Sequence, residues 1–270
     1  MTGRLEGKIA IITGAARGTG AATARLFVEE GARVCLADVL DEAGQAVALE
    51  LGDAAMFQHM DVRSEGDWNR AVEATRERFG SVNVLVNNAA ILDVGPIAEL
   101  DVEKARDILD VNLIGPMIGT SAVLGDMQEA GGGAIVNIGS IDAMEGMGWV
   151  APYSASKWGL RGFTKSAALE LGQLGIRVNL VCPAGGSPEL TQGFISNIQQ
   201  RRDAGETIEL RGLEGGVLGE REATPRDIAN VVLFLASDDA GFCHGAEYMV
   251  DGGHTAGHIW FATKSDAKES

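Results

Sequence analysis

The sequence predicts a single α/β domain over residues 1–270, built on a doubly wound parallel sheet of about seven strands flanked by helices. Short apolar runs alternate along the chain with helical stretches, which is the order that a parallel sheet with helical crossovers requires. The 270 residues are 46% hydrophobic and suit one large core, and no internal repeat divides them. The expected strands are 8–13, 33–37, 55–59 (the weakest), 83–86, 134–139, 176–181 and 247–250. The expected helices are 18–30, 41–51, 64–79, 101–130, 152–173 and 225–237, the last with Thr224-Pro225 as its start signal.

The first strand leads into a glycine-rich turn and then a helix. An apolar run ends at Thr13, and Gly14-Ala-Ala-Arg-Gly18-Thr-Gly20 follows it. Such a turn lets the backbone approach a pyrophosphate closely and directs the free amides of a helix start at it. The spacing G-x-x-x-G-x-G departs from the common G-x-G-x-x-G. We expect a dinucleotide site here, with an ordinary turn as the alternative.

The second strand ends in an acid at a spacing typical of a ribose contact. Asp38 lies 18 residues after Gly20. A carboxylate near this spacing accepts hydrogen bonds from the adenosine ribose and repels a 2′-phosphate. Arg17 is a contrary sign, because an arginine in the turn can reach a 2′-phosphate. We expect Asp38 to dominate, so the sequence favours NAD over NADP. A strand-end acid that caps the next turn is the structural alternative.

Tyr153 and Lys157 stand four residues apart, so a helix places them on one face. An ammonium beside a phenol favours the phenolate, and we expect Lys157 to lower the pKa of Tyr153 from its ordinary value of about 10. A tyrosine tuned in this way exchanges a proton with a carbonyl or an alcohol. Alone, the pair is more typical of a surface helix; together with the nucleotide turn it indicates acid–base chemistry.

Several separated motifs resemble the short-chain dehydrogenase/reductase family, from about residue 5 to residue 255. The glycine turn is similar to the family's cofactor loop, Asp61-Val62 to its adenine contact, and Asn87-Asn88-Ala89-Ala90 to the segment beside the cofactor. The resemblance implies a single-domain Rossmann fold that binds NAD. The cofactor contacts that we expect are Gly14, Arg17, Gly18, Thr19, Gly20, Asp38, Asp61, Val62, Asn88, Ala89, Tyr153, Lys157, Pro183, Gly185 and Ser187.

The family's four catalytic positions are matched by Asn112, Ser140, Tyr153 and Lys157. The resemblance implies that Tyr153 passes a proton to or from the substrate oxygen while hydride moves between the substrate carbon and the nicotinamide. It implies that Lys157 binds the nicotinamide ribose and lowers the pKa of Tyr153. It also implies that Ser140 orients the substrate oxygen and that Asn112 helps to hold a water that links Lys157 to solvent.

The segment 183–222 is expected to form a substrate lid, because it follows a strand and hangs over the nicotinamide edge of the sheet. Family members usually carry Pro-Gly, a β-branched residue and a threonine here; this chain has Pro183-Ala-Gly185-Gly-Ser187-Pro. Ser187 is the candidate replacement for the threonine, and the glycines favour a mobile lid. A smaller departure is Ala90, where the family usually has glycine.

The stretches 36–44, 59–62 and 246–253 most resemble bacterial NAD-dependent hydroxysteroid dehydrogenases of this family, of the 3α/20β or 17β type. This resemblance implies a steroid substrate. Met144, Met147, Trp149 and Leu190 offer apolar walls, with core or subunit packing as the alternative. Asp142 and Glu145 either bind a distal hydroxyl or face water. The substrate contacts that we expect are Ser140, Asp142, Met144, Trp149, Tyr153, Gly185 and Leu190.

Three other functions stay open. One is a dehydrogenase of another cyclic or bulky secondary alcohol, and a second is a 3-ketoacyl reductase. Such reductases usually use NADPH, which Asp38 disfavours. They also need a basic patch to dock an acidic carrier protein, which the net charge of −16 disfavours. The third is a non-catalytic NAD-binding regulator, which the intact catalytic set disfavours.

The same charge argues against nucleic acid or an anionic membrane as a partner. We recognise no apolar stretch long enough to span a bilayer and no leader signal, and expect a cytoplasmic protein. The isolated Cys35, Cys182 and Cys243 indicate reduced thiols. No metal site is expected at His254 and His258, because the neighbouring glycines oppose a helix there. The family resemblance implies a homotetramer formed through 101–130, 152–173 and the last strand. The polar tail 258–270 is either disordered or covers a neighbour's pocket.

Overall fold

The computed structural model describes residues 3–185, 188–208, 221 and 223–257. Its strands form one parallel sheet in the order β3-β2-β1-β4-β5-β6-β7. The predicted doubly wound sheet of seven strands is therefore confirmed, including the weakest strand. The strands are β1 (Ile9–Thr13), β2 (Arg33–Asp38), β3 (Ala55–His59), β4 (Val84–Asn87), β5 (Gly133–Ile138), β6 (Ile176–Pro183) and β7 (Glu247–Val250).

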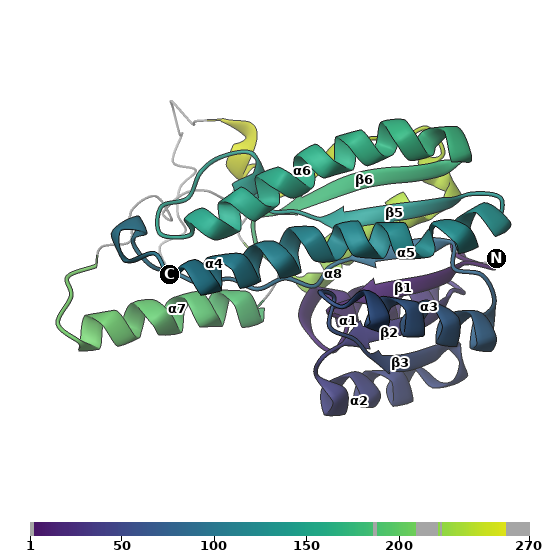
Figure 1. The fold of residues 1–270 in the computed structure, drawn as a ribbon, viewed down its shortest axis with the longest axis horizontal. Helices are drawn as coiled ribbons and strands as arrows, with labels where there is room; N and C mark the ends of the chain where they lie inside the picture. Colours follow the sequence, from purple (N-terminus) through teal and green to yellow (C-terminus); the bar gives the residue numbers. More distant parts are fainter. Residues whose placement is uncertain (1–2, 186–187, 209–220, 222, 258–270) are drawn as a thin grey trace, which may run out of the picture.

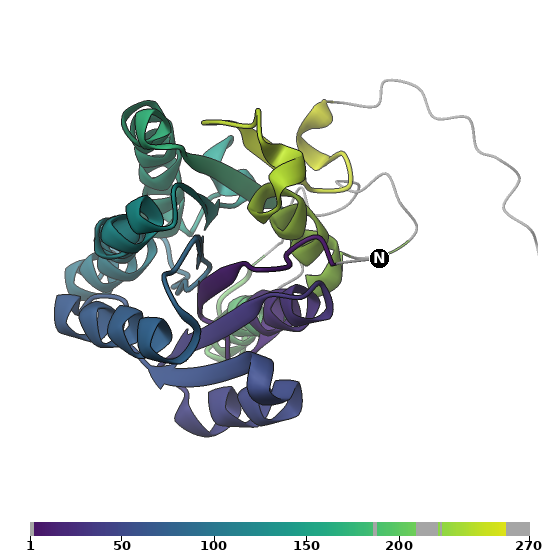
Figure 2. The same cartoon turned by 90° about the vertical axis from the view of Figure 1, so that its right-hand side faces the viewer.

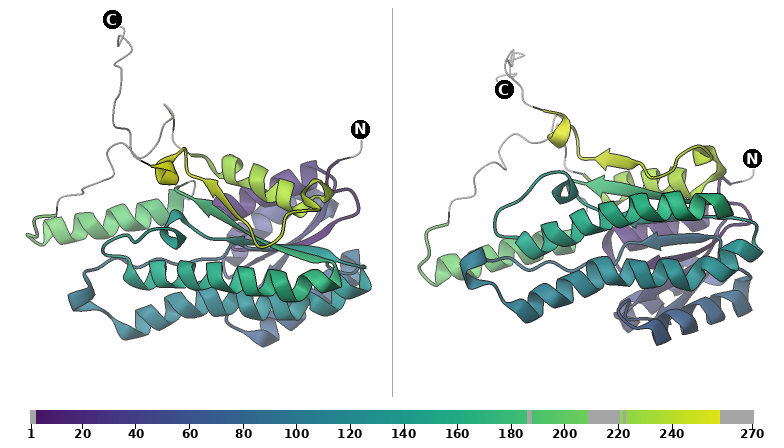
Figure 3. Two further views of the ribbon diagram at one scale, coloured as in Figure 1. Left: turned by 90° about the horizontal axis from the view of Figure 1, so that it is seen from above. Right: turned by 45° about the horizontal axis from the view of Figure 1, so that its top comes forward.

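Helices cover both faces of the sheet, as Figures 1 and 2 show. One face carries α3, α4, α5 and α6, and the other carries α1, α2 and α8. The helix α7 lies at the same end of the molecule as α4 (Figures 1 and 3). The helices are α1 (Gly18–Glu29), α2 (Asp41–Leu51), α3 (Glu65–Phe79), α4 (Val102–Leu109), α5 (Gly115–Glu129), α6 (Ala151–Leu171), α7 (Pro188–Asp203) and α8 (Pro225–Ala236).

The core divides into two layers because successive strand residues point to opposite faces. Ile12 and Leu36 pack with α1 and α8, whereas their neighbours Ile11 and Cys35 pack with α3, α5 and α6. Both sets are fully buried. This explains why the strands read as continuous apolar runs rather than as alternating ones.

The predicted helix 101–130 is in fact two helices joined by a π-helical turn, Asp110–Ile114. A π turn holds one extra residue and often occurs at a functional site. Here it contains the buried Asn112. The sequence analysis expected one helix here, because the chain stays helical on both sides of the insertion.

The helix α7 was not predicted, although it begins at Pro188, a common first helical residue. It occupies the segment expected to be a mobile lid. The remaining parts of that segment, 186–187, 209–220 and 222, and the tail 258–270 lie outside the described residues. By contrast, α8 starts as predicted, with a capping box in which Thr224 and Asp227 satisfy each other's backbone amides.

The expectation that no stretch is long and apolar enough to span a bilayer was wrong on length and composition. Among the described helices, the run Val102–Glu129 meets both criteria. Within the structure this run contacts α3, α6, β4 and β5, as a core helix does.

The close approach of α5 to α3 depends on one glycine. A Cβ atom on Gly119 would lie 2.4 Å from the indole ring of Trp68, which is fully buried and donates its Nε1 hydrogen to Val62 O at 2.9 Å. On the same helix, Gly125 is exposed, and a Cβ atom added there would have no neighbour within 4 Å. The two glycines form a matched pair for testing this packing.

We predict that Gly119→Ala destabilises the protein by about 1–3 kcal/mol, because the rigid indole must move. Gly125→Ala is expected to be neutral or to stabilise by up to about 1 kcal/mol through its higher helix propensity. Urea unfolding midpoints at constant m value measure both. Equal midpoints for the two variants would contradict the packing argument.

Candidate active site

A cavity of about 750 Å³ opens at the carboxyl ends of the strands. It spans the point between β1 and β4 where the strand order reverses, which is where doubly wound sheets bind ligands. Fifteen of the sequence-predicted residues reach it. They are Gly14, Arg17, Gly18, Thr19, Asp38, Asp61, Val62, Asn88, Ala89, Ser140, Asp142, Tyr153, Lys157, Pro183 and Gly185.

The glycine turn packs tightly against the segment that follows β4. Gly14 has φ +63°, and a Cβ there would lie 2.8 Å from Ala89 Cα. Asn88 Nδ2 donates to the carbonyls of Thr13 and Gly14 at 2.9 and 3.0 Å. Gly20 does not line the cavity, but a Cβ on it would lie 2.2 Å from Gly14 O. Glycine is therefore needed at both positions for the start of α1 to reach the cavity.

Asp38 forms part of the cavity wall and is fixed by the backbone. Its Oδ2 accepts from Ala16 N at 2.9 Å and its Oδ1 accepts from Leu40 N at 3.0 Å. The carboxylate thus caps the turn and also lines the cavity, so the two interpretations of this residue are compatible. Arg17 lines the same region but is exposed.

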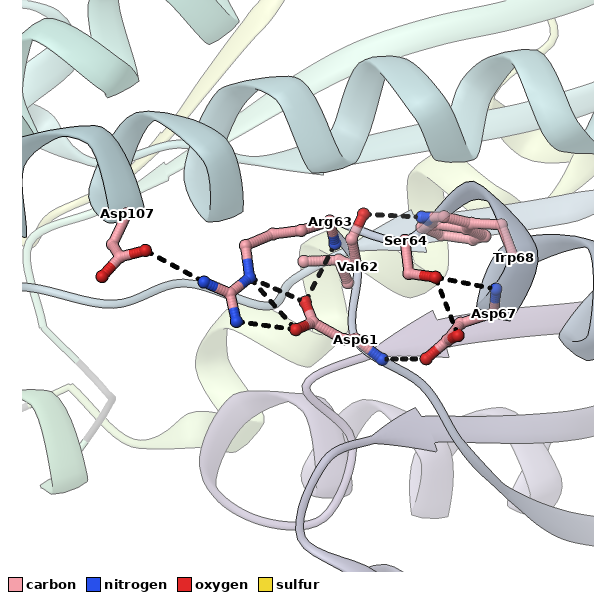
Figure 4. A network of polar contacts seen from close by, with 7 residues as sticks. All are labelled: Asp61, Val62, Arg63, Ser64, Asp67, Trp68 and Asp107. Carbon is pink, nitrogen blue, oxygen red and sulfur yellow. Dashed lines mark hydrogen bonds and ion pairs between the residues drawn. The ribbon is translucent and has the colours of Figure 1, made fainter. Parts of the chain in front are cut away.

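Two charged residues that the sequence analysis missed, Arg63 and Asp107, also line the cavity. Figure 4 shows Arg63 between Asp61 and Asp107. Arg63 donates from Nη2 to Asp61 Oδ2 at 2.7 Å and from Nη1 to Asp107 Oδ1 at 3.0 Å. The hydrogen bonds from Arg63 lower the pKa of Asp61. The network joins the turn after β3 to α4, 44 residues further along the chain. No local pattern signals such a contact.

Tyr153 and Lys157 project from α6 and are almost fully buried. Lys157 Nζ donates to Ile138 O at 2.8 Å and lies 5.4 Å from the centre of the tyrosine ring. Burial lowers the pKa of Lys157 to about 8. Burial also raises the pKa of Tyr153, against a smaller opposite effect of a hydrogen bond with Ser140. The predicted lowering of the Tyr153 pKa was wrong, because desolvation is the largest influence on this phenol and favours its neutral form.

Ser140 follows β5 and is bonded twice to one residue. Its Oγ donates to Asp142 Oδ2 at 2.9 Å and accepts from Asp142 N at 3.1 Å. Burial raises the pKa of Asp142. The structure therefore places Ser140, Asp142 and Tyr153 at one wall of the cavity.

Asn112 does not line the cavity. Its Oδ1 accepts from Ile91 N at 2.8 Å, and its Nδ2 donates to Ile91 O at 2.9 Å and to Ser156 Oγ at 3.2 Å. The amide thus fixes a cavity-lining residue, Ile91, against α6. In this structure Asn112 therefore holds part of the cavity wall in place.

Two expected substrate contacts lie elsewhere. Met144 packs against the buried cluster of Leu160 and Cys182, and Trp149 packs beside Tyr153 outside the cavity lining. Trp149 is in the left-handed region, with φ +73°, and Arg201 lies over its ring. For both residues the structure agrees with the alternative given in the sequence analysis, which was core packing. Ser187 and the side chain of Leu190 lie outside the described residues.

Other apolar residues form the wall near Tyr153. Phe194 and Ile195 lie on α7, which the sequence analysis left without structure, and this is why these two were missed. The other wall residues are Leu92, Val150 and Met147, of which Met147 was expected from the sequence.

Within the described ranges, no group of three or more His, Cys, Asp or Glu side chains is arranged to hold a metal ion. His258 lies outside these ranges. The three cysteines are free, and burial raises the pKa of Cys35 to about 11 and that of Cys182 to about 12.

The buried Lys157 makes stability depend on pH. Its folded pKa of about 8 lies below the unfolded value of about 10.4, so between these values the unfolded chain binds more protons and stability rises with pH. From pH 7 to pH 9.5, we predict that the free energy of unfolding of the wild type rises by roughly 2 kcal/mol relative to Lys157→Met. Urea unfolding of both proteins at the two pH values measures this. A constant difference between them would show that Lys157 is not desolvated.

Comparison with known proteins places this site in a family. A family profile described as enoyl-(acyl carrier protein) reductase matches residues 14–255. The chain is 44% identical over 257 residues to a 3-alpha-(or 20-beta)-hydroxysteroid dehydrogenase of Mycobacterium tuberculosis, which covers 95% of this chain and 93% of that protein.

Two further relatives have other names. A trans-4-hydroxycyclohexanecarboxylate dehydrogenase of Sinomonas cyclohexanicum is 39% identical over 94% of this chain and 95% of its own length. A cyclopentanol dehydrogenase of Comamonas testosteroni is 37% identical over 94% and 99%. The chain belongs to the short-chain dehydrogenase/reductase family and is an alcohol dehydrogenase or reductase.

Proposed function

We propose that the protein interconverts a secondary alcohol and a ketone with NAD(H), and that its substrate is a hydroxysteroid. The observation that carries this proposal is the sharing of one cavity: Ser140, Tyr153 and Lys157 line the same space as the glycine turn and Asp38. Proton-transfer groups and a nucleotide cradle thus face each other. The relative named as a hydroxysteroid dehydrogenase, at 44% identity, supports the steroid class.

The residues present fit a dinucleotide. Any side chain at Gly14 would fill the space between the turn and Ala89, so the turn keeps the close backbone approach that a pyrophosphate needs. Asp38 supports NAD over NADP, because its fixed carboxylate would meet a ribose 2′-phosphate with a like charge. In this proposal Gly18 and Thr19 hold the pyrophosphate, and Asp61 and Val62 hold the adenine.

The chemistry follows from the protonation states. When bound, the nicotinamide supplies or accepts the hydride. Burial keeps Tyr153 a neutral phenol, which is the form that donates a proton to a ketone oxygen. In the oxidation direction, Tyr153 must become a phenolate, and the nearby ammonium of Lys157 stabilises that state more strongly in a low-dielectric site than in water. Ser140 contacts the same substrate oxygen.

The apolar wall supports a bulky, largely apolar substrate. Val150, Leu92 and Phe194 pack around Tyr153, and Met147 adds an adaptable surface. The names of two relatives favour a second candidate, a smaller cyclic secondary alcohol. The enzyme assignment removes the non-catalytic regulator from consideration.

We also propose a homotetramer. On α6, Trp158 and Leu169 are exposed, whereas Leu160 is buried in the core, so the two exposed apolar side chains are available to a partner subunit. Light scattering coupled to gel filtration measures the mass. The cytoplasmic location stays a prediction.

We predict that NAD-dependent oxidation occurs with at least one of the 3-, 7-, 12-, 17- or 20-hydroxysteroids and that Tyr153→Phe removes nearly all of it. A general acid or base contributes about 10²–10⁴-fold or more to the rate. Nicotinamide absorbance gives the rates, and calorimetry of NAD binding to the variant shows whether its fold and cofactor site persist. Turnover of cyclopentanol or cyclohexanols alone would favour the smaller substrate class.

We predict that Asp38→Asn lowers the ratio of kcat/KM with NAD to kcat/KM with NADP by about tenfold or more, because it removes one charge facing the 2′-phosphate. Asp41→Asn is the matched control. Asp41 lies three residues away, pairs with His59 and does not line the cavity, so its ratio should stay unchanged. A preference for NADP in the wild type would contradict the assignment of Asp38.

A further inference from the structure

A buried carboxylate lies directly against the serine hydroxyl of the proposed site. Asp142 is 5% exposed, lines the cavity and is the hydrogen-bond acceptor for Ser140. Its second oxygen, Oδ1, is buried beside the Ser154 hydroxyl, which also favours the ionised carboxylate. The side-chain partners of this buried acid are therefore two serine hydroxyls, one of which, Ser140, belongs to the proposed site.

The hydrogen bonds of Ser140 limit what it can offer a substrate. A serine hydroxyl has one hydrogen to donate and two lone pairs to accept with. The hydrogen goes to Asp142 Oδ2, and one lone pair receives the backbone N–H of Asp142. One lone pair remains. With Asp142 ionised, this lone pair can accept a hydrogen bond from the Tyr153 hydroxyl or from a substrate alcohol, but Ser140 has no hydrogen left to donate to a ketone.

Protonation of Asp142 reverses this arrangement. The carboxyl O–H would then donate to Ser140 Oγ, and the serine hydrogen would be free to turn to the substrate oxygen. The proton on Asp142 comes from bulk water and stays on the carboxyl, while the proton that reaches the substrate comes from Tyr153. Every donor and acceptor of Ser140 is satisfied in this state as well.

The surroundings of Asp142 favour its protonation. Burial disfavours its ionised form, as does the negative charge of Glu145. The hydrogen bonds from Ser140 and Ser154 and the charge of Lys157 favour that form, and the pKa of Asp142 is raised overall. Glu145 itself is bonded to His254. The groups that face Ser140 and Asp142 from the neighbouring elements are Tyr153, Ser154, Lys157 and Arg161 on α6 and Cys182 on β6.

We propose that Asp142 is a positioning residue that acts through Ser140: ionised, it holds the serine as an acceptor suited to alcohol oxidation, and protonated, it releases the serine as a donor suited to ketone reduction. The inference rests on the proposed function and deepens it. It gives the enzyme a pH-dependent preference for one direction that is separate from the proton consumed or released in the reaction.

The first test is independent of turnover. Carbon-13 NMR of aspartate-labelled protein, with Asp142→Asn to assign the signal, measures the pKa of Asp142. Ser140→Ala should raise that pKa, because it removes a donor to the charged form. Glu145→Gln, the control, removes a like charge without touching Ser140 and should lower it. An unchanged pKa in Ser140→Ala would overturn the positioning role whether or not the enzyme turns over.

The second test is kinetic. For the wild type, kcat/KM for reduction should fall by about tenfold as pH rises through the measured pKa of Asp142, and kcat/KM for oxidation should rise. In Asp142→Asn both changes should disappear, because the amide can donate to Ser140 at every pH. In a Ser140→Ala background, the same substitution should change either rate less than about twofold.

The outcomes separate the two proposals. If Asp142→Asn changed kcat/KM as strongly in the Ser140→Ala background as in the wild type, the proposal that Asp142 acts through Ser140 would be overturned. A second outcome is that no steroid or cyclic alcohol is turned over, while Ser140→Ala still raises the pKa of Asp142. This outcome would contradict the proposed function but would establish the hydrogen bond between Ser140 and Asp142.

Discussion

The contact between the turn after β1 and the segment after β4 is the constraint on which the rest of the site depends. Thr13 Oγ1 accepts from the backbone amides of Asn88 and Ala89 at 3.0 Å, and Asn88 returns two hydrogen bonds to the turn. These bonds join the two strands between which the order of the sheet reverses. Because they hold the backbone of Gly14 against Ala89, they set how closely a ligand can approach the start of α1.

Much of the fold could be predicted because local pattern and global packing agree. Both faces of the parallel sheet are covered, so its strands are apolar throughout and stand out between helices. The exceptions are informative. The π turn at Asn112 lies inside a continuous helical run, so no break in the helix marks it. The helix α7 has a polar composition and lies over the cavity rather than over the sheet, so it lacks the stripe that marks a core helix. Sequence periodicity indicates which side of an element is buried against the sheet, and burial against the sheet does not determine the positions of the π turn and α7.

The candidate site divides along the same line. Residues attached to a strand end, such as Asp38 and Ser140, could be placed from the sequence because the strand fixes where they emerge. Residues brought in by distant elements could not. Asp107 reaches the cavity only because α4 packs beside the turn after β3, and Phe194 reaches it from α7. Met144 and Trp149 are residue types suited to a substrate wall, but their side chains pack against neighbouring hydrophobic clusters instead.

The largest difference between sequence and structure concerns charge rather than position. Spacing alone brings Lys157 to Tyr153, but it says nothing of solvent, and burial is the dominant influence on both groups. Desolvation favours the neutral forms of Tyr153 and Asp142 and weakens the charged form of Lys157. Such a site has few countercharges and a low dielectric, so a charge that forms within it interacts strongly with its neighbours. The short distances between these groups then matter more than their individual pKa values, because a proton gained by one changes which neighbour can donate or accept. The direction of the hydrogen bonds between Asp142, Ser140 and Tyr153 thus depends on which of these groups holds a proton.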